Sequence, residues 1–157
     1  MLSQTVLSTN SPRLRIPIIK MKVVRGGYSY SDNPVITDSG SAFRFMHPYF
    51  EGHDREEMVA LMLNAKHRML GLHTISIGSA QFSIVHPRET FKAAIVMNAV
   101  CLILAHNHPS GDPAPSAEDG ELTRRLVEAG KLLGITVLDH IIIGEGQYYS
   151  FQDSNRL

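Results

Sequence analysis

Two histidines and one aspartate, His106, His108 and Asp119, have the residue types and spacing to bind a metal ion. In a strand, residues i and i+2 point to the same face, so both histidines would leave the apolar run 100–105 side by side. Two imidazoles and one carboxylate make a three-ligand zinc set with an open fourth position, which is typical of catalytic zinc sites. Zinc in such a site lowers the pKa of a bound water from about 15.7 to about 7, which gives a nucleophile near neutral pH.

A helix start explains part of the same pattern without a metal. Ser116 and Asp119 have the spacing of a capping box, with Ser116 at the N-cap and Asp119 near the third helical position. The two roles are compatible, because one oxygen of Asp119 can face the helix amides while the other faces a metal. A close histidine pair alone is weak evidence, so the metal hypothesis depends on the order of strand end, histidine pair, proline-rich loop and helix start.

The stretch 106–119 resembles a known signature. It reads His-Asn-His-Pro-Ser-Gly-Asp-Pro-Ala-Pro-Ser-Ala-Glu-Asp, and it contains the His-x-His-Pro and Ser-x-x-Asp elements of JAMM (MPN+) metalloproteases. More narrowly, it is similar to the RadC family and carries every fixed position of that family's form. The resemblance includes the flanking strings 85–89 and 138–140, and it runs from about Val35 to about Gly144.

The resemblance implies a fold, a cofactor and an activity. The fold is a JAMM/MPN domain with a cytidine-deaminase-like three-layer architecture. The cofactor is one zinc ion per chain, bound by His106, His108 and Asp119. The activity is hydrolysis of a peptide or isopeptide bond in a protein or peptide substrate through a zinc-activated water.

A hydrolase of this kind also needs a base that accepts a proton from the activated water. JAMM enzymes place a glutamate just before an apolar strand upstream of the histidines, and Glu56 matches this position. Its neighbour Glu57 would point to the opposite face of the strand, and Glu89, at the start of a predicted helix, is a third candidate. Glu56 and Glu57 are also explained as a solvated charge pair in a turn, and Glu89 by its place at the start of a helix. Ser116 would hydrogen-bond an oxyanion, as in JAMM enzymes, besides capping its helix.

Other polar residues near the motif carry weaker signals. A structural role is the commoner fate of histidines such as His86 and His140 in apolar surroundings, and support of a metal ligand from behind is the functional alternative. Ser110 and Asp112 are expected to shape the loop, since Ser and Asp bond their own backbone in turns. With no His-Glu-x-x-His and a single cysteine, Cys101, the sequence matches neither a thermolysin-like site nor a zinc deaminase.

The charge balance bears on a competing hypothesis. Lys plus Arg and Asp plus Glu number 15 each, so the formal net charge is zero. This balance argues against strong sequence-independent binding to DNA. The alternative function is the traditional DNA-repair role of the RadC family, exerted by nucleic-acid or protein binding without peptidase turnover. We find no match to the helix-hairpin-helix-like region that usually precedes the RadC domain, which weakens this alternative.

The sequence also suggests a compartment. A single cysteine cannot form an intrachain disulfide, which favours a cytoplasmic protein. We find neither an apolar stretch of membrane-spanning length nor the pattern of a signal peptide, so no membrane association is expected.

Hydrophobic periodicity predicts an α/β fold with a mixed β-sheet flanked by helices. Residues 1–17 are expected to be a flexible lead, residues 18–34 a strand and loop, and residues 35–157 the RadC-like JAMM/MPN domain. Helices are expected at 37–49, 87–99 and 116–133, strands at 18–24, 58–63, 69–77, 100–105, 135–143 and 147–151, and a short extended piece at 81–85.

Overall fold

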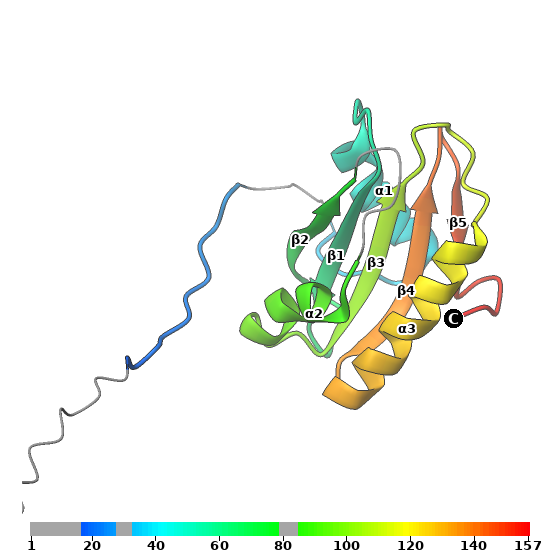
Figure 1. The fold of residues 1–157 in the computed structure, drawn as a ribbon. Coiled ribbons are helices and arrows are strands. Elements are labelled where there is room, and N and C mark those ends of the chain that lie inside the picture. The colour runs from blue at the N-terminus through cyan, green and yellow to red at the C-terminus, as the bar shows by residue number, and fades with distance from the viewer. Residues whose placement is uncertain (1–16, 28–32, 79–84) are drawn as a thin grey trace, which may run out of the picture.

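The computed structural model describes residues 17–27, 33–78 and 85–157. Within them, a mixed five-stranded sheet is flanked by helices on both faces (Figure 1), which confirms the predicted α/β class. The chain runs through α1 (Ser39–Phe50), β1 (Glu57–Leu63), β2 (Met69–Ile77), α2 (Pro87–Val96), β3 (Cys101–Asn107), α3 (Ala117–Leu133), β4 (Thr136–Ile143) and β5 (Tyr148–Ser150).

The strand order β2-β1-β3-β4-β5 puts β3 at the centre of the sheet. β1 is antiparallel to both β2 and β3, and β4 is antiparallel to β5. β3 and β4 are parallel, so the chain must cross over between them, and α3 makes this connection. The amino-terminal end of α3 therefore follows shortly after the carboxyl end of β3.

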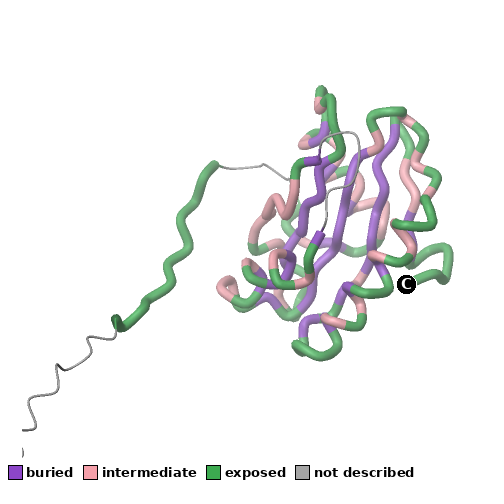
Figure 2. Tube along the Cα trace, viewed as in Figure 1, coloured by how far each residue is buried: buried purple, intermediate pink, exposed green. Residues whose placement is uncertain are grey.

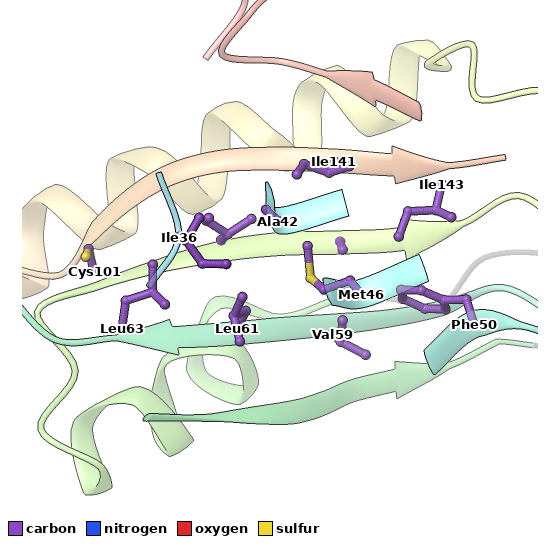
Figure 3. Close-up of a cluster of buried hydrophobic side chains, with 12 residues drawn as sticks. Ile36, Ala42, Met46, Phe50, Val59, Leu61, Leu63, Cys101, Ile141 and Ile143 are labelled. Atoms are coloured by element: carbon purple, nitrogen blue, oxygen red, sulfur yellow. The ribbon is translucent and has the colours of Figure 1, made fainter. Parts of the chain in front are cut away.

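Alternation along β1 and β3 supplies a core to each face of the sheet. Val59, Leu61 and Ile103 pack toward α1, in the cluster drawn in Figure 3. Residues of the opposite parity, such as Leu102 and Leu104, pack with residues of α2 and α3. β1 and β3 are buried over their whole length (Figure 2), as expected for central strands covered on both sides.

Local capping sets the ends of the helices. Asp38 is the N-cap of α1 and accepts a 2.6 Å hydrogen bond from the amide of Ser41. Ser116 is the N-cap of α3, and Gly134 ends this helix in the left-handed conformation with φ of 70°. None of the helices in the described part of the chain combines the length and apolarity needed to cross a membrane.

The strand predicted at 18–24 is wrong. Residues 17–27 form no strand, and they run away from the sheet in Figure 1 with Ile18 93% and Val24 82% exposed. A run rich in Ile and Val forms a strand where a neighbour satisfies its backbone groups and a core buries one face. Residues 17–27 have neither. Of the extended piece predicted at 81–85, residues 81–84 lie outside the described residues.

Two element ends differ from the prediction near the motif. β3 continues through His106 and Asn107, because these residues pair with Ile142 and Ile143 of β4. The helix at Pro87 ends at Val96 rather than near residue 99, where Asn98 adopts a positive φ of 53°. The first difference matters for the site, since it places His106 inside a paired and buried strand.

Candidate metal centre

His106, His108 and Asp119 converge where the end of β3 meets the start of α3. The Nε2 atoms of the two histidines lie 3.0 Å apart. Asp119 Oδ1 lies 3.3 Å from His106 Nε2, and Asp119 Oδ2 lies 3.8 Å from His108 Nε2. One nitrogen or oxygen from each side chain falls within 4.8 Å of the other two, so the three side chains can hold a metal ion.

The two oxygens of Asp119 have different neighbours. Oδ2 accepts hydrogen bonds from the amide of Ser116 at 2.8 Å and from its hydroxyl at 2.7 Å, while the amide of Asp119 donates to Ser116 Oγ at 3.1 Å. These bonds form the capping box of α3. Oδ1 is the oxygen nearer His106. The helix cap thus aims the carboxylate without using both of its oxygens.

The loop after β3 orients His108. The ring Nδ1 of His108 lies 2.8 Å from the carbonyl oxygen of Asp112, so it donates its hydrogen there. Asp112 is held in turn, because its amide donates to Ser110 Oγ and its Oδ1 accepts from the amide of Ala114. Ser110 and Asp112 therefore shape the loop, and a neutral His108 presents the lone pair of Nε2 to Asp119 and His106.

Close packing holds this loop against the end of β4. The amide of Glu145 donates a 2.9 Å hydrogen bond to the carbonyl of Gly111. A Cβ at Gly144 would collide with that same carbonyl and lie 2.9 Å from Pro113 Cδ. The absence of a side chain at Gly144 thus allows the loop that carries His108 to approach the sheet.

A second layer of polar residues lies behind His106. Its Nδ1 is 2.8 Å from Nε2 of His140 in β4, and His140 Nδ1 is 2.6 Å from the hydroxyl of Thr123 in α3. His140 and Thr123 are fully buried. The ring of His140 also stacks on Phe151 at 5.1 Å between centroids.

The electrostatics favour the ligand forms of these groups. Burial lowers the pKa of His106 to about 4, although Asp119 acts to raise it. Burial also lowers the pKa of His140 well below 6.5. Burial acts to raise the pKa of Asp119, but His106 and hydrogen bonds from Ser116 outweigh it and hold this pKa below its ordinary value. At neutral pH the buried rings are neutral and the carboxylate is ionised, as metal binding requires.

Glu57 lies on the other face of the sheet. It is buried in β1, and its carboxylate accepts hydrogen bonds from the hydroxyls of Tyr49 and, at 2.9 Å, Thr74. His53 Nδ1 is 3.1 Å from its second oxygen. Since Tyr49 belongs to α1, Glu57 points toward that helix and away from the face that carries His106.

Glu56 is exposed and directly precedes β1. Alternation gives it the same face as Met58, the residue that pairs with His106 across β1 and β3. The backbone on either side of Glu56 is bound by the side chain of Asn107, at the end of β3. Asn107 Oδ1 accepts from the amide of Glu57 at 2.8 Å, and Asn107 Nδ2 donates to the carbonyl of Arg55 at 3.0 Å.

The other candidates, Glu89 and His86, both lie at the start of α2 and act there. Glu89 lies in the first turn of α2, 2.6 Å from Lys92 Nζ and 3.4 Å from Arg88 Nε. His86 is the N-cap of the same helix, and its Nδ1 accepts from the amide of Arg88 at 3.3 Å. Neither residue belongs to the group formed by His106, His108 and Asp119.

Sequence reasoning did not single out Asn107 or Thr123. Thr123 follows Asp119 by four residues, so helical spacing could have pointed to it. Asn107 carried no separate signal between the two histidines.

A hollow of about 390 Å³ adjoins His108, lined among others by Phe50, His53 and Asn107.

Comparison with known proteins gives consistent matches. A family model described as "RadC-like JAB domain" matches residues 36–156. A UPF0758 protein of Caldanaerobacter subterraneus is 59% identical over 99 residues, which cover 63% of this chain and 42% of the relative. A UPF0758 protein of Methanosarcina mazei is 48% identical over 118 residues, which cover 75% of this chain and 52% of the relative. The chain thus spans about half the length of these curated relatives, and the match over most of its own length shows that it belongs to the family of RadC-like JAB domains, within the JAMM/MPN proteins.

Proposed function

We propose that this domain is a zinc-dependent hydrolase that cleaves a peptide or isopeptide bond. The observation that carries the proposal is the convergence of His106 Nε2, His108 Nε2 and a carboxylate oxygen of Asp119 on one point. Two imidazoles and one carboxylate fit zinc and leave a coordination position open for catalysis. When bound there, zinc supplies Lewis-acid activation of water and of the scissile carbonyl.

Glu56 is our candidate for the general base. Strand alternation from Met58 gives Glu56 the face of the sheet that carries His106, whereas the buried Glu57 is engaged by hydroxyls on the opposite face. An exposed carboxylate is free to accept a proton from water and pass it to the leaving amine. Asn107 supports this role, because its side-chain amide holds the backbone of residues 55–57 beside the end of β3.

Ser116 is our candidate donor to the oxyanion of a tetrahedral intermediate. Its hydroxyl is exposed and adjoins Asp119, but its hydrogen points to Asp119 Oδ2 at 2.7 Å. To stabilise an oxyanion, the hydroxyl has to turn toward the substrate while its oxygen keeps the amide hydrogen bond of the helix cap. The proposed substrate is a protein or peptide.

Metal analysis combined with a peptidase screen tests the proposal. Purified protein should contain about one zinc per chain, and His106→Ala or Asp119→Ala should lose it. A peptide library should be cleaved by the zinc-loaded protein and spared after treatment with a chelator. Absence of zinc from the native protein, or its retention by both variants, would contradict the site.

A matched pair of variants tests the base. Glu56→Gln should keep zinc and lower hydrolysis by about 10²- to 10⁴-fold, the usual contribution of a general base. Glu57→Gln, one residue away on the other face, should keep zinc and most of the activity. If Glu57→Gln abolished hydrolysis and Glu56→Gln did not, Glu57 would be the base.

A further inference from the structure

We propose that Thr123 and His140 form a hydrogen-bonded relay that sets the tautomer of His106 and so directs the lone pair of His106 Nε2 at the metal. The inference rests on the proposed metal site and adds two positioning residues to it. His140 lies 34 residues from His106 in the chain, and it is a neighbour of His106 because β3 and β4 pair.

The relay begins at a carbonyl group, which can only accept. The hydroxyl of Thr123 lies 2.6 Å from the backbone oxygen of Asp119, one helical turn earlier, so its single hydrogen is donated there. Thr123 Oγ1 is also 2.6 Å from His140 Nδ1. With its hydrogen already used, the hydroxyl oxygen can only accept, and His140 Nδ1 must carry the hydrogen.

His140 in turn fixes the tautomer of His106. A neutral His140 with hydrogen on Nδ1 has a lone pair on Nε2. That atom lies 2.8 Å from His106 Nδ1, so His106 donates from Nδ1. A neutral His106 then has its own lone pair on Nε2, which faces Asp119 Oδ1 at 3.3 Å and His108 Nε2 at 3.0 Å.

The other tautomer of His106 would leave a hydrogen bond of α3 unmade. If His106 carried its hydrogen on Nε2, His140 would donate from Nε2 and Thr123 would donate to His140. The oxygens of Thr123 and Asp119 would then face each other at 2.6 Å with no hydrogen between them. All four groups of the relay are buried or partly buried, so water cannot readily repair such a contact.

The loop fixes the tautomer of His108 in the same sense. His108 Nδ1 donates to the carbonyl of Asp112, so both facing Nε2 atoms present lone pairs, next to a carboxylate. Three acceptors that converge in this way form a set that a cation can bind. Metal-bound histidines usually donate their other N–H to a carboxylate, a carbonyl or water, and loss of such a partner weakens metal binding about 10- to 100-fold. Here a buried histidine takes that place.

Tautomer and zinc affinity are measured separately to test the relay. Nitrogen NMR of the imidazoles in chelator-treated protein should show His106 protonated on Nδ1. Competition with a chromogenic chelator should show zinc affinity reduced about 10- to 100-fold in Thr123→Val, which keeps the side-chain shape and removes the hydroxyl. Thr123→Ser, which restores the hydroxyl, should bind zinc within about threefold of wild type, well short of the 10- to 100-fold loss.

Thr90→Val is the matched control. Thr90 is likewise fully buried in a helix, and its hydroxyl contacts the carbonyl of His86 one turn earlier, away from the histidine cluster. It should leave both readouts unchanged, so an equal loss of zinc affinity in Thr90→Val and Thr123→Val would overturn the relay. So would a hydrogen on His106 Nε2 in the metal-free protein, or wild-type zinc affinity in Thr123→Val. Failure of zinc-loaded protein to cut any peptide, with tautomer and affinity as predicted, would contradict the proposed hydrolysis and leave the relay standing.

Discussion

Asp119→Asn should separate the two roles of Asp119, which caps α3 through Oδ2 and faces His106 through Oδ1. Asparagine keeps an oxygen that can accept from the amide of Ser116, so the helix cap is retained. The change removes the negative charge, and its NH₂ group can donate to the lone pair of His106 Nε2. We therefore expect the metal-free variant to fold and to lose only the stability that the charge adds at the helix start, about 0.3–1 kcal/mol.

The rise in Tm on adding zinc should be much smaller in Asp119→Asn than in the wild type. At a zinc concentration of about 100 times Kd, binding stabilises the wild type by about 2.7 kcal/mol. For a domain of this size, each kcal/mol raises Tm by about 2–4 °C, so the expected shift is about 5–11 °C. Loss of a residue that supports a metal ligand weakens metal affinity up to about 100-fold, and loss of the charged ligand itself should weaken zinc affinity at least as much. At the same zinc concentration, the stabilisation of the variant is then at most about 0.4 kcal/mol, which raises Tm by about 1–2 °C.

Thermal unfolding followed by circular dichroism, with chelator and then with zinc, measures both quantities. Asp38→Ala is the matched control, because it removes the side chain that caps α1 and leaves Asp119 and its hydrogen bonds in place. Loss of this cap costs about 1 kcal/mol, so Tm should fall by about 2–4 °C in chelator. The zinc-induced shift of Asp38→Ala should stay close to that of the wild type.

The result that refutes this reasoning is a zinc-induced shift of wild-type size in Asp119→Asn. It would mean that the carboxylate serves only the helix and that zinc, if bound, uses other ligands. A fall in metal-free stability well above about 1 kcal/mol would refute the second part, since it would show that the helix cap is lost with the charge.

Three further outcomes follow from burial and packing. Glu57→Gln should lower the free energy of unfolding by about 1.5–3 kcal/mol in urea titrations, because hydrogen bonds to a buried charge are lost. Glu56→Gln, at the surface, should change this free energy by less than about 0.5 kcal/mol. Similar values for the two variants would show that Glu57 is exposed to solvent. The folded state holds the pKa of His106 at about 4, below 6.5, so the unfolded chain binds a proton first as pH falls. The stability conferred by this residue is thus present above pH 6.5 and is lost toward pH 4, by about 3 kcal/mol in chelator, and unchanged urea midpoints over this range would contradict its burial as a neutral ring. Gly144→Ala should displace the loop at Gly111, destabilise the fold by about 1–3 kcal/mol and weaken zinc binding in the chelator competition, whereas wild-type affinity would show that the loop adapts.

The sequence by itself determined the features that depend on near neighbours. The i, i+2 spacing of His106 and His108 and the capping-box spacing of Ser116 and Asp119 each depend on a few residues of backbone geometry. Periodicity located the helices and most strands for the same reason, to within a few residues at the ends. Residues 18–24 show the limit of this reasoning, since an Ile- and Val-rich run becomes a strand only when a partner strand is available.

Tertiary structure decided everything that depends on pairing between distant segments. Alternation predicted that Glu56 and Glu57 point to opposite faces, but only the pairing of Met58 with His106 shows which face carries the histidine cluster. His140 supports His106 because β3 and β4 lie side by side in register, and no local pattern encodes that register. Local geometry is set by steric limits on each residue, whereas strand register is set by the combined packing of all layers.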